Sequence, residues 1–296
     1  MTTPAREQYL SIKKQHQDAI LLFRIGDFYE TFDDDARTLS REMEIALTSR
    51  EMGGKQRIPL AGIPYHALEP YLARLIRKGY KVAICEQVGD PATSKGPMER
   101  KVVRVVTPGT VIEDSLLDVK ANNYLMSVVT DGDNVGVAYA DITTSEFATS
   151  QFPIGELDLE LGRLSPAEIL AGDGYEGPAP DGAMGTTLDP DAFDLEWDRD
   201  MLLDHFGVAS LEAFGCEGLP LATKAAGAIV DYLRRNQKTA LSQVTTLYTY
   251  STSAYMVLDA QTRRNLELFQ AGRWGKTTAS LFSVLDRTET PMGGRL

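Results

Sequence analysis

The stretch 20–32 constrains this 296-residue chain most, because an apolar run stops there abruptly at a glycine turn. Residues 20–25 are apolar almost throughout, which predicts a strand that is buried on both faces. After Asp27, apolar residues recur at spacings of three and four, which predicts an amphipathic helix over residues 28–47. Asp27 and Glu30 would then form an Asp-x-x-Glu capping pattern where that helix starts.

Phe28 is not explained by such a helix, since it lies off the apolar stripe and directly after the turn at Gly26-Asp27. One use for an apolar side chain at such a place is as a wedge, because apolar groups inserted between base steps unstack and kink a duplex. The other interpretation is that Phe28 packs under a neighbouring loop. For Glu30, the plain alternative is a role as a helix cap.

The five residues from Gly26 to Glu30 resemble the Phe-x-Glu mismatch-recognition element of the MutS family of DNA mismatch-repair proteins. More stretches resemble the same family in the same order, so the resemblance spans the whole chain. It implies that Phe28 stacks on a mispaired base and that Glu30 reads that base. The supporting stretches are residues 58–66, 82–91, 100–110, 141–147, 259–268 and 285–296.

The resemblance implies an α/β multidomain fold in three parts. These are a mixed α/β mismatch-binding domain at 1–113, a ribonuclease-H-like α/β connector at 116–239, and the start of an α-helical core or lever domain at 240–296. The residue pattern adds a β-hairpin over 123–141, turning at Asp131-Gly132-Asp133-Asn134, and a helix over 221–235. Residues 48–56 are polar and contain glycine, which predicts a loop.

The net charge of −12 hides an uneven distribution along the chain. Residues 1–110 hold 17 Lys and Arg against 14 Asp and Glu, whereas residues 111–220 hold 3 against 23. A mildly basic first domain can track phosphates, and an acidic middle segment would be repelled by them. The candidate phosphate contacts in the first domain are Arg50, Lys55, Arg57 and Arg100.

Two other functions are considered for the middle segment. Ribonuclease-H-like nucleases hold two divalent metals with strand carboxylates, and Asp141, Glu146 and Glu168 lie near one another in sequence. No second carboxylate has a spacing that specifies a metal pair, so we expect no metal site. The second alternative is a protein-interaction module, since the resemblance implies that the connector contacts MutL-type partners.

No Gly-x-x-x-x-Gly-Lys-Ser/Thr loop occurs in the chain, so we expect neither ATPase activity nor a cofactor in these residues. We therefore expect the chain to be an N-terminal fragment. For the complete protein, the resemblance implies a homodimer and a DNA-dependent ATPase that uses ATP and Mg²⁺.

The chain has no apolar run near 18 residues and no signal-peptide pattern at its start, so we expect a cytoplasmic protein without membrane contact. Cys85 and Cys216 lack metal-ligand spacing, and both are expected to be reduced thiols.

Overall fold

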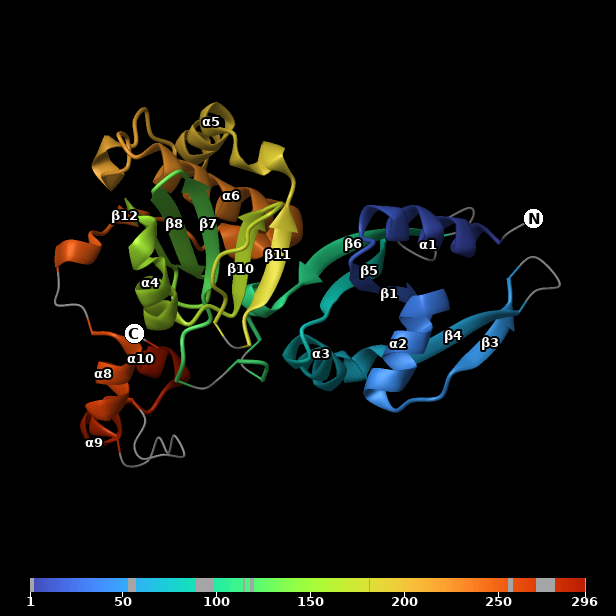
Figure 1. Ribbon diagram of the computed structural model, residues 1–296. Coiled ribbons are helices and arrows are strands. Elements are labelled where there is room, and N and C mark those ends of the chain that lie inside the picture. The colour runs from blue at the N-terminus through green and yellow to red at the C-terminus, as the bar shows by residue number, and fades with distance from the viewer. Residues whose placement is uncertain are drawn as a thin grey trace. The chain divides into compact units, whose positions relative to one another are not determined.

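The computed structural model describes residues 3–52, 57–88, 98–113, 115–117, 120–180, 182–254, 258–269 and 280–295. The chain divides into two compact units, unit 1 (Met1–Pro108) and unit 2 (Gly109–Leu296). Each unit contains one six-stranded sheet with helices packed on it, which agrees with the predicted α/β multidomain fold (Figure 1). The predicted division between residues 239 and 240 falls inside unit 2 and stays a prediction.

Unit 1 is a six-stranded sheet in the order β3-β4-β2-β1-β5-β6 with helices packed on it. β1 and β5 are parallel, and the other neighbouring strands are antiparallel. Tyr9 packs edge-on against Phe23 and Phe32 at the centre of one core. The elements are α1 (Pro4–Gln15), β1 (Ala19–Ile25), β2 (Phe28–Phe32), α2 (Asp33–Met43), β3 (Thr48–Glu51), β4 (Arg57–Pro64), α3 (Leu68–Arg77), β5 (Lys81–Val88) and β6 (Glu99–Val106).

The prediction of a helix beginning at Phe28 was wrong. Residues 28–32 form strand β2, which folds back on β1 as a hairpin, and α2 begins only at Asp33. Gly26 adopts a φ of +58° at the turn, where glycine has no Cβ penalty. Apolar residues on both faces of a central strand imitate a helical stripe, which explains the error. The capping role predicted for Asp27 and Glu30 was therefore wrong as well.

The loop prediction for residues 48–56 was wrong at its start, because Thr48–Glu51 is the edge strand β3. Polar side chains suit a short edge strand that faces solvent on one side, and such a strand lacks the apolar alternation of an interior one.

Unit 2 has a second six-stranded sheet in the order β11-β10-β7-β8-β9-β12. The predicted hairpin is confirmed as β7–β8, and β9 extends it to an antiparallel meander. Parallel β10 and β11 continue the sheet beyond β7, which fits the predicted ribonuclease-H-like shape. The sheet elements are β7 (Leu125–Asp131), β8 (Asn134–Asp141), β9 (Glu146–Pro153), β10 (Glu168–Gly172), β11 (Met184–Leu188) and β12 (Tyr248–Thr249).

Helices cover both faces of this second sheet. α6 packs on one face with α5 outside it, and α4 packs on the other (Figure 1). The predicted helix over residues 221–235 is confirmed as α6, and it is apolar because it is enclosed. The helices are α4 (Leu157–Leu164), α5 (Leu195–Phe206), α6 (Pro220–Asn236), α7 (Lys238–Leu241), α8 (Ala260–Asn265), α9 (Leu281–Leu285) and α10 (Pro291–Arg295).

Both cysteines are buried and free, one in each unit. Burial raises the pKa of the Cys85 thiol to about 12 and also raises the pKa of Cys216. Among the described helices, none combines the length and apolarity needed to cross a membrane.

Candidate nucleic-acid interface

The β1–β2 hairpin of unit 1 leaves Phe28 at the surface. Phe28 is the first residue of β2 and is 47% exposed, whereas its neighbour Tyr29 is only 4% exposed. Alternation along a strand sends successive side chains to opposite faces, so Phe28 and Glu30 share a face. The interpretation that Phe28 packs under a neighbouring loop does not fit this exposure.

The turn that carries Phe28 is fixed by its surroundings. The Asp27 carbonyl accepts a hydrogen bond from the Tyr65 backbone N–H at 3.0 Å. The Arg24 guanidinium donates to the Gly26 carbonyl and lies 3.9 Å from the centre of the Tyr65 ring. Tyr65 is itself 45% exposed, so a second aromatic side chain borders the turn.

Sequence reasoning missed this role of Arg24 and Tyr65. The available signal was the position of Tyr65 directly after Pro64, where a strand would end beside the turn. The cation–π contact itself depends on a long-range approach that spacing does not reveal.

Glu30 is buried, with 7% of the residue exposed, and both of its carboxylate oxygens accept hydrogen bonds from Arg50. The Nη1 and Nη2 atoms of Arg50 lie 2.9 and 3.0 Å from the two oxygens, which is a bidentate ion pair. From the sequence, Glu30 was predicted to contact a base and Arg50 to contact a phosphate. The structure brings these two residues together.

The other predicted basic residues differ in how free they are. Exposed Arg57 donates from Nε to the Ser49 hydroxyl and from Nη2 to the Ser49 carbonyl, both at 2.8 Å. Arg100 is half-buried; its Nε donates to the Arg24 carbonyl at 2.7 Å, and burial lowers its pKa. Lys55 lies outside the described residues. Arg57 is thus the more accessible cation, and Arg100 also supports the hairpin strand.

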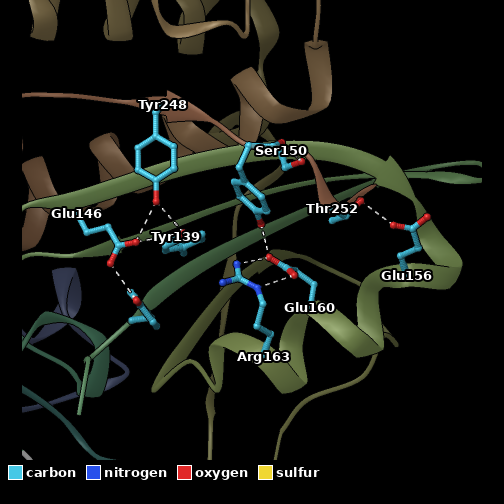
Figure 2. A network of polar contacts seen from close by, with 10 residues as sticks. Tyr139, Glu146, Ser150, Glu156, Glu160, Arg163, Tyr248 and Thr252 are labelled. Carbon is cyan, nitrogen blue, oxygen red and sulfur yellow. Dashed lines mark hydrogen bonds and ion pairs between the residues drawn. The ribbon is translucent and has the colours of Figure 1, made fainter. Parts of the chain in front are cut away.

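Unit 2 contains a different polar cluster, made of tyrosines and glutamates (Figure 2). Glu146 accepts hydrogen bonds from the hydroxyls of Tyr124, Tyr139 and Tyr248 at 2.9, 3.2 and 3.0 Å. Burial is the main reason that the pKa values of all three tyrosines are raised. The hydroxyls therefore keep their protons and serve as donors to Glu146.

A cavity of about 440 Å³ lies beside this cluster, lined by residues of β8, α4, β12 and the segment from Tyr250 to Arg263 of α8. Arg163 forms a bidentate pair with Glu160, and its guanidinium lies over the rings of Tyr139 and Tyr250 at 5.8 and 5.5 Å. The aromatic wall of the cavity is thus already occupied by a cation of the same chain.

The carboxylates considered for a nuclease each hold local structure in unit 2. Asp141 accepts from the backbone N–H groups of Asn123 and Thr143 at 2.9 and 2.8 Å. Glu168 is fully buried and accepts from Tyr232 and Thr186 hydroxyls at 2.8 and 2.7 Å. In the described part of the chain, no group of three or more His, Cys, Asp and Glu side chains is arranged to hold a metal.

Comparison with known proteins gives two domain matches in order along the chain. Residues 3–115 match MutS domain I, and residues 123–245 match MutS domain II. The chain also resembles curated proteins called DNA mismatch repair protein MutS over its whole length. It is 52% identical to one from Dehalococcoides mccartyi over 297 residues, covering 100% of this chain and 35% of that protein.

More distant organisms carry similar proteins of the same name. The chain is 46% identical to one from Methanococcoides burtonii and 45% identical to one from Halothermothrix orenii; each match covers 99% of the chain and 34% of the relative. The chain therefore spans about a third of the length of the curated relatives it matches. With both of its units matched to consecutive domains of one family, the chain belongs to the MutS family of DNA mismatch-repair proteins.

Proposed function

We propose that this chain recognises mismatched or unpaired bases in duplex DNA, with Phe28 as the inserted wedge. The observation that carries the proposal is the exposure of a phenylalanine on a strand hairpin whose turn is fixed by Arg24 and Tyr65. Inserting an apolar side chain costs least where base pairing is already poor, so a fixed wedge favours mismatched sites.

Glu30 is proposed as the residue that reads the displaced base. It shares a face of the sheet with Phe28 and follows it by two residues, so both side chains face the same region of a bound duplex. A carboxylate beside DNA also repels the phosphates. Matched DNA, which offers no displaced base to Glu30, would experience mainly this repulsion, which gives discrimination by penalty.

The phosphate contacts are proposed for the basic residues of unit 1. Arg57 is the best placed of the described candidates, because it is exposed and pairs with no carboxylate in the described part of the chain. Lys55, Arg50 and Arg100 stay in the proposal, although Arg50 and Arg100 also hold neighbouring groups of unit 1.

Proposals for the complete protein rest on the family and reach beyond these 296 residues. They are a cytoplasmic homodimer, a DNA-dependent ATPase that uses ATP and Mg²⁺ in another domain, and contact of a MutL-type protein with unit 2. The strongly acidic segment 111–220 supports a protein-facing role for unit 2, since phosphates would repel it.

The test is a binding measurement on the full-length protein with matched and single-mismatch duplexes. Because base–aromatic stacking contributes about 1–3 kcal/mol, Phe28→Ala should lower mismatch preference by about tenfold or more. Val103→Ala is the matched control, since Val103 is also an exposed apolar residue of unit 1 but lies on edge strand β6. If Phe28→Ala keeps the full mismatch preference, the wedge lies elsewhere.

A further inference from the structure

The Glu30–Arg50 pair joins two strands that are not neighbours. Glu30 lies on β2 and Arg50 on β3, and β4 runs between them. Gly62 of β4 is the register partner of Glu30. A Cβ at Gly62 would lie 3.5 Å from Glu30 Cγ and 3.2 Å from the Tyr29 carbonyl oxygen. The Glu30 side chain therefore passes over a position that has no side chain of its own.

The two partners differ in their exposure. The Glu30 side chain is 9% exposed, whereas the Arg50 side chain is 50% exposed. A covered carboxylate is costly unless it is paired and hydrogen-bonded, and Arg50 supplies both requirements at once. Arg50 thus lies between the covered Glu30 carboxylate and the solvent, and its positive charge neutralises that carboxylate.

Arg50 has donors to spare in this arrangement. A guanidinium carries more N–H groups than the two that Glu30 uses, and the remaining ones lie on a half-exposed side chain. The same residue can hold Glu30 and face a phosphate. A phosphate contact alone would weaken matched and mismatched binding equally, because phosphates carry no sequence information.

We infer that Arg50 is a positioning residue for mismatch discrimination: it holds the Glu30 carboxylate through the bidentate pair and balances its charge at the DNA-facing surface. This inference rests on the proposed role of Glu30 in base reading. Its distinguishing consequence is coupling, since the effect of Arg50 on discrimination must depend on the presence of Glu30. A simple phosphate contact at Arg50 would act independently of Glu30.

The experiment is a double-mutant cycle on the full-length protein. Affinities for matched and single-mismatch duplexes are measured for the wild type, Arg50→Ala, Glu30→Ala and the double variant. Arg50→Ala should lower discrimination by about fivefold in the wild-type background, equivalent to about 1 kcal/mol, and by less than about twofold in the Glu30→Ala background. Equal factors in the two backgrounds would overturn the inference.

Arg50→Lys separates charge from geometry. Lysine keeps the positive charge but cannot form the two-pronged pair, so the salt dependence of binding should stay and part of the discrimination should be lost. Full discrimination in Arg50→Lys would contradict a positioning role. This variant also carries the test if Arg50→Ala fails to fold, which thermal unfolding of the 296-residue chain would reveal.

Arg57→Ala is the matched control, because Arg57 is a nearby exposed arginine that bonds Ser49 and not Glu30. Its effect on affinity should be the same with and without Glu30. The two proposals fail differently. If Phe28→Ala and Glu30→Ala leave mismatch preference unchanged, the proposed function is wrong; if they reduce it and the Arg50 cycle is additive, only the positioning role is wrong.

Discussion

Gly136 in unit 2 and Gly62 in unit 1 both lie within interior strands, but the groups that pack against them differ. A Cβ at Gly136 would lie 2.2 Å from the Leu221 carbonyl group, so its space is taken by the backbone of α6. A Cβ at Gly62 would lie 3.2 Å from the Tyr29 carbonyl oxygen and in ordinary contact, at 3.5 Å, with Cγ of the Glu30 side chain. The sheet of unit 2 is closed by its helices at this point, whereas the sheet of unit 1 keeps a polar side chain there.

The same contrast applies to the buried carboxylates of the two units. Glu30 is bonded through both oxygens to a half-exposed arginine. Asp198 of α5 is fully buried, and neither of its oxygens has a hydrogen-bond partner among the described residues. Because its partner Arg50 is half-exposed, the Glu30 carboxylate lies near the surface and can take part in binding. Asp198 is enclosed between helices, so it affects mainly the stability of unit 2.

Gly136→Ala should give the largest effect, because it forces a methyl group into the backbone of α6. Overpacking of this kind costs about 1–3 kcal/mol and sometimes more, and contact with backbone places Gly136 at the upper end. Urea unfolding of the chain measures the loss. Gly185→Ala is the control, since Gly185 lies on edge strand β11 with open space around it. Equal stability of the two variants would contradict the close approach.

Asp198→Asn should change how stability depends on pH. Burial, followed by the nearby carboxylates of Asp231 and Asp194, raises the pKa of Asp198 from 3.8 to about 8 in the folded protein. Between about pH 4 and pH 8, Asp198 is therefore protonated in the folded state and ionised in the unfolded state. Stability from this group is complete at the acid end and is lost as pH rises through that window.

The asparagine variant lacks this titration but still buries a polar group that has no partner among the described residues, so it recovers only part of the linkage free energy. At about pH 8 it should be more stable than the wild type by about 1–2 kcal/mol. Denaturant unfolding at several pH values gives the profile. Asp200→Asn, on the exposed side of the same helix, should leave the profile unchanged. A wild-type profile that stays flat over this window would show that Asp198 titrates normally.

Gly62→Ala should have a moderate effect on stability and a clearer one on DNA discrimination. The new methyl group would lie tight against the Tyr29 carbonyl oxygen and in van der Waals contact with Glu30 Cγ, so a destabilisation of about 1 kcal/mol is expected. Relief of the contact with Tyr29 moves strand β2 and Glu30 with it, so mismatch preference should fall severalfold. In the Glu30→Ala background, Gly62→Ala should no longer change that preference. If Gly62→Ala still changes the preference in that background, its effect does not act through Glu30.

Arg57→Ala should give the smallest effect, an equal weakening of matched and mismatched binding. Losing one phosphate contact should reduce the slope of log K against log salt by about one unit. Titrations at several salt concentrations measure it. A change in mismatch preference with an unchanged slope would remove Arg57 from the proposed phosphate contacts.

The sequence predicted the elements whose pattern is decided locally. The β7–β8 hairpin has a polar glycine turn between two apolar runs, and α6 has an apolar face of helical period, so both were found. Strand β2 was missed because Tyr29 and Phe32, three residues apart on its two faces, continue the helical spacing of the residues after them, and β3 was missed because an edge strand has little pattern. Local periodicity does not distinguish these cases from helix and loop.

The site was predicted in part for the same reason. The position of Phe28 off any apolar stripe was visible in the sequence, and the structure leaves Phe28 exposed. The Glu30–Arg50 pair was not visible, because it depends on β4 bringing β2 and β3 to its two sides. Long-range pairing is fixed by the sheet and not by spacing along the chain.

The two buried cysteines have a practical consequence for site-specific fluorescent labelling. Thiolates are the reactive form of cysteine, and burial together with a raised pKa keeps Cys85 and Cys216 from forming them near neutral pH. A maleimide dye should therefore leave this 296-residue chain unlabelled and react with one added surface thiol. Asp133→Cys at the exposed β7–β8 turn would place a fluorophore on unit 2 without removing either native cysteine.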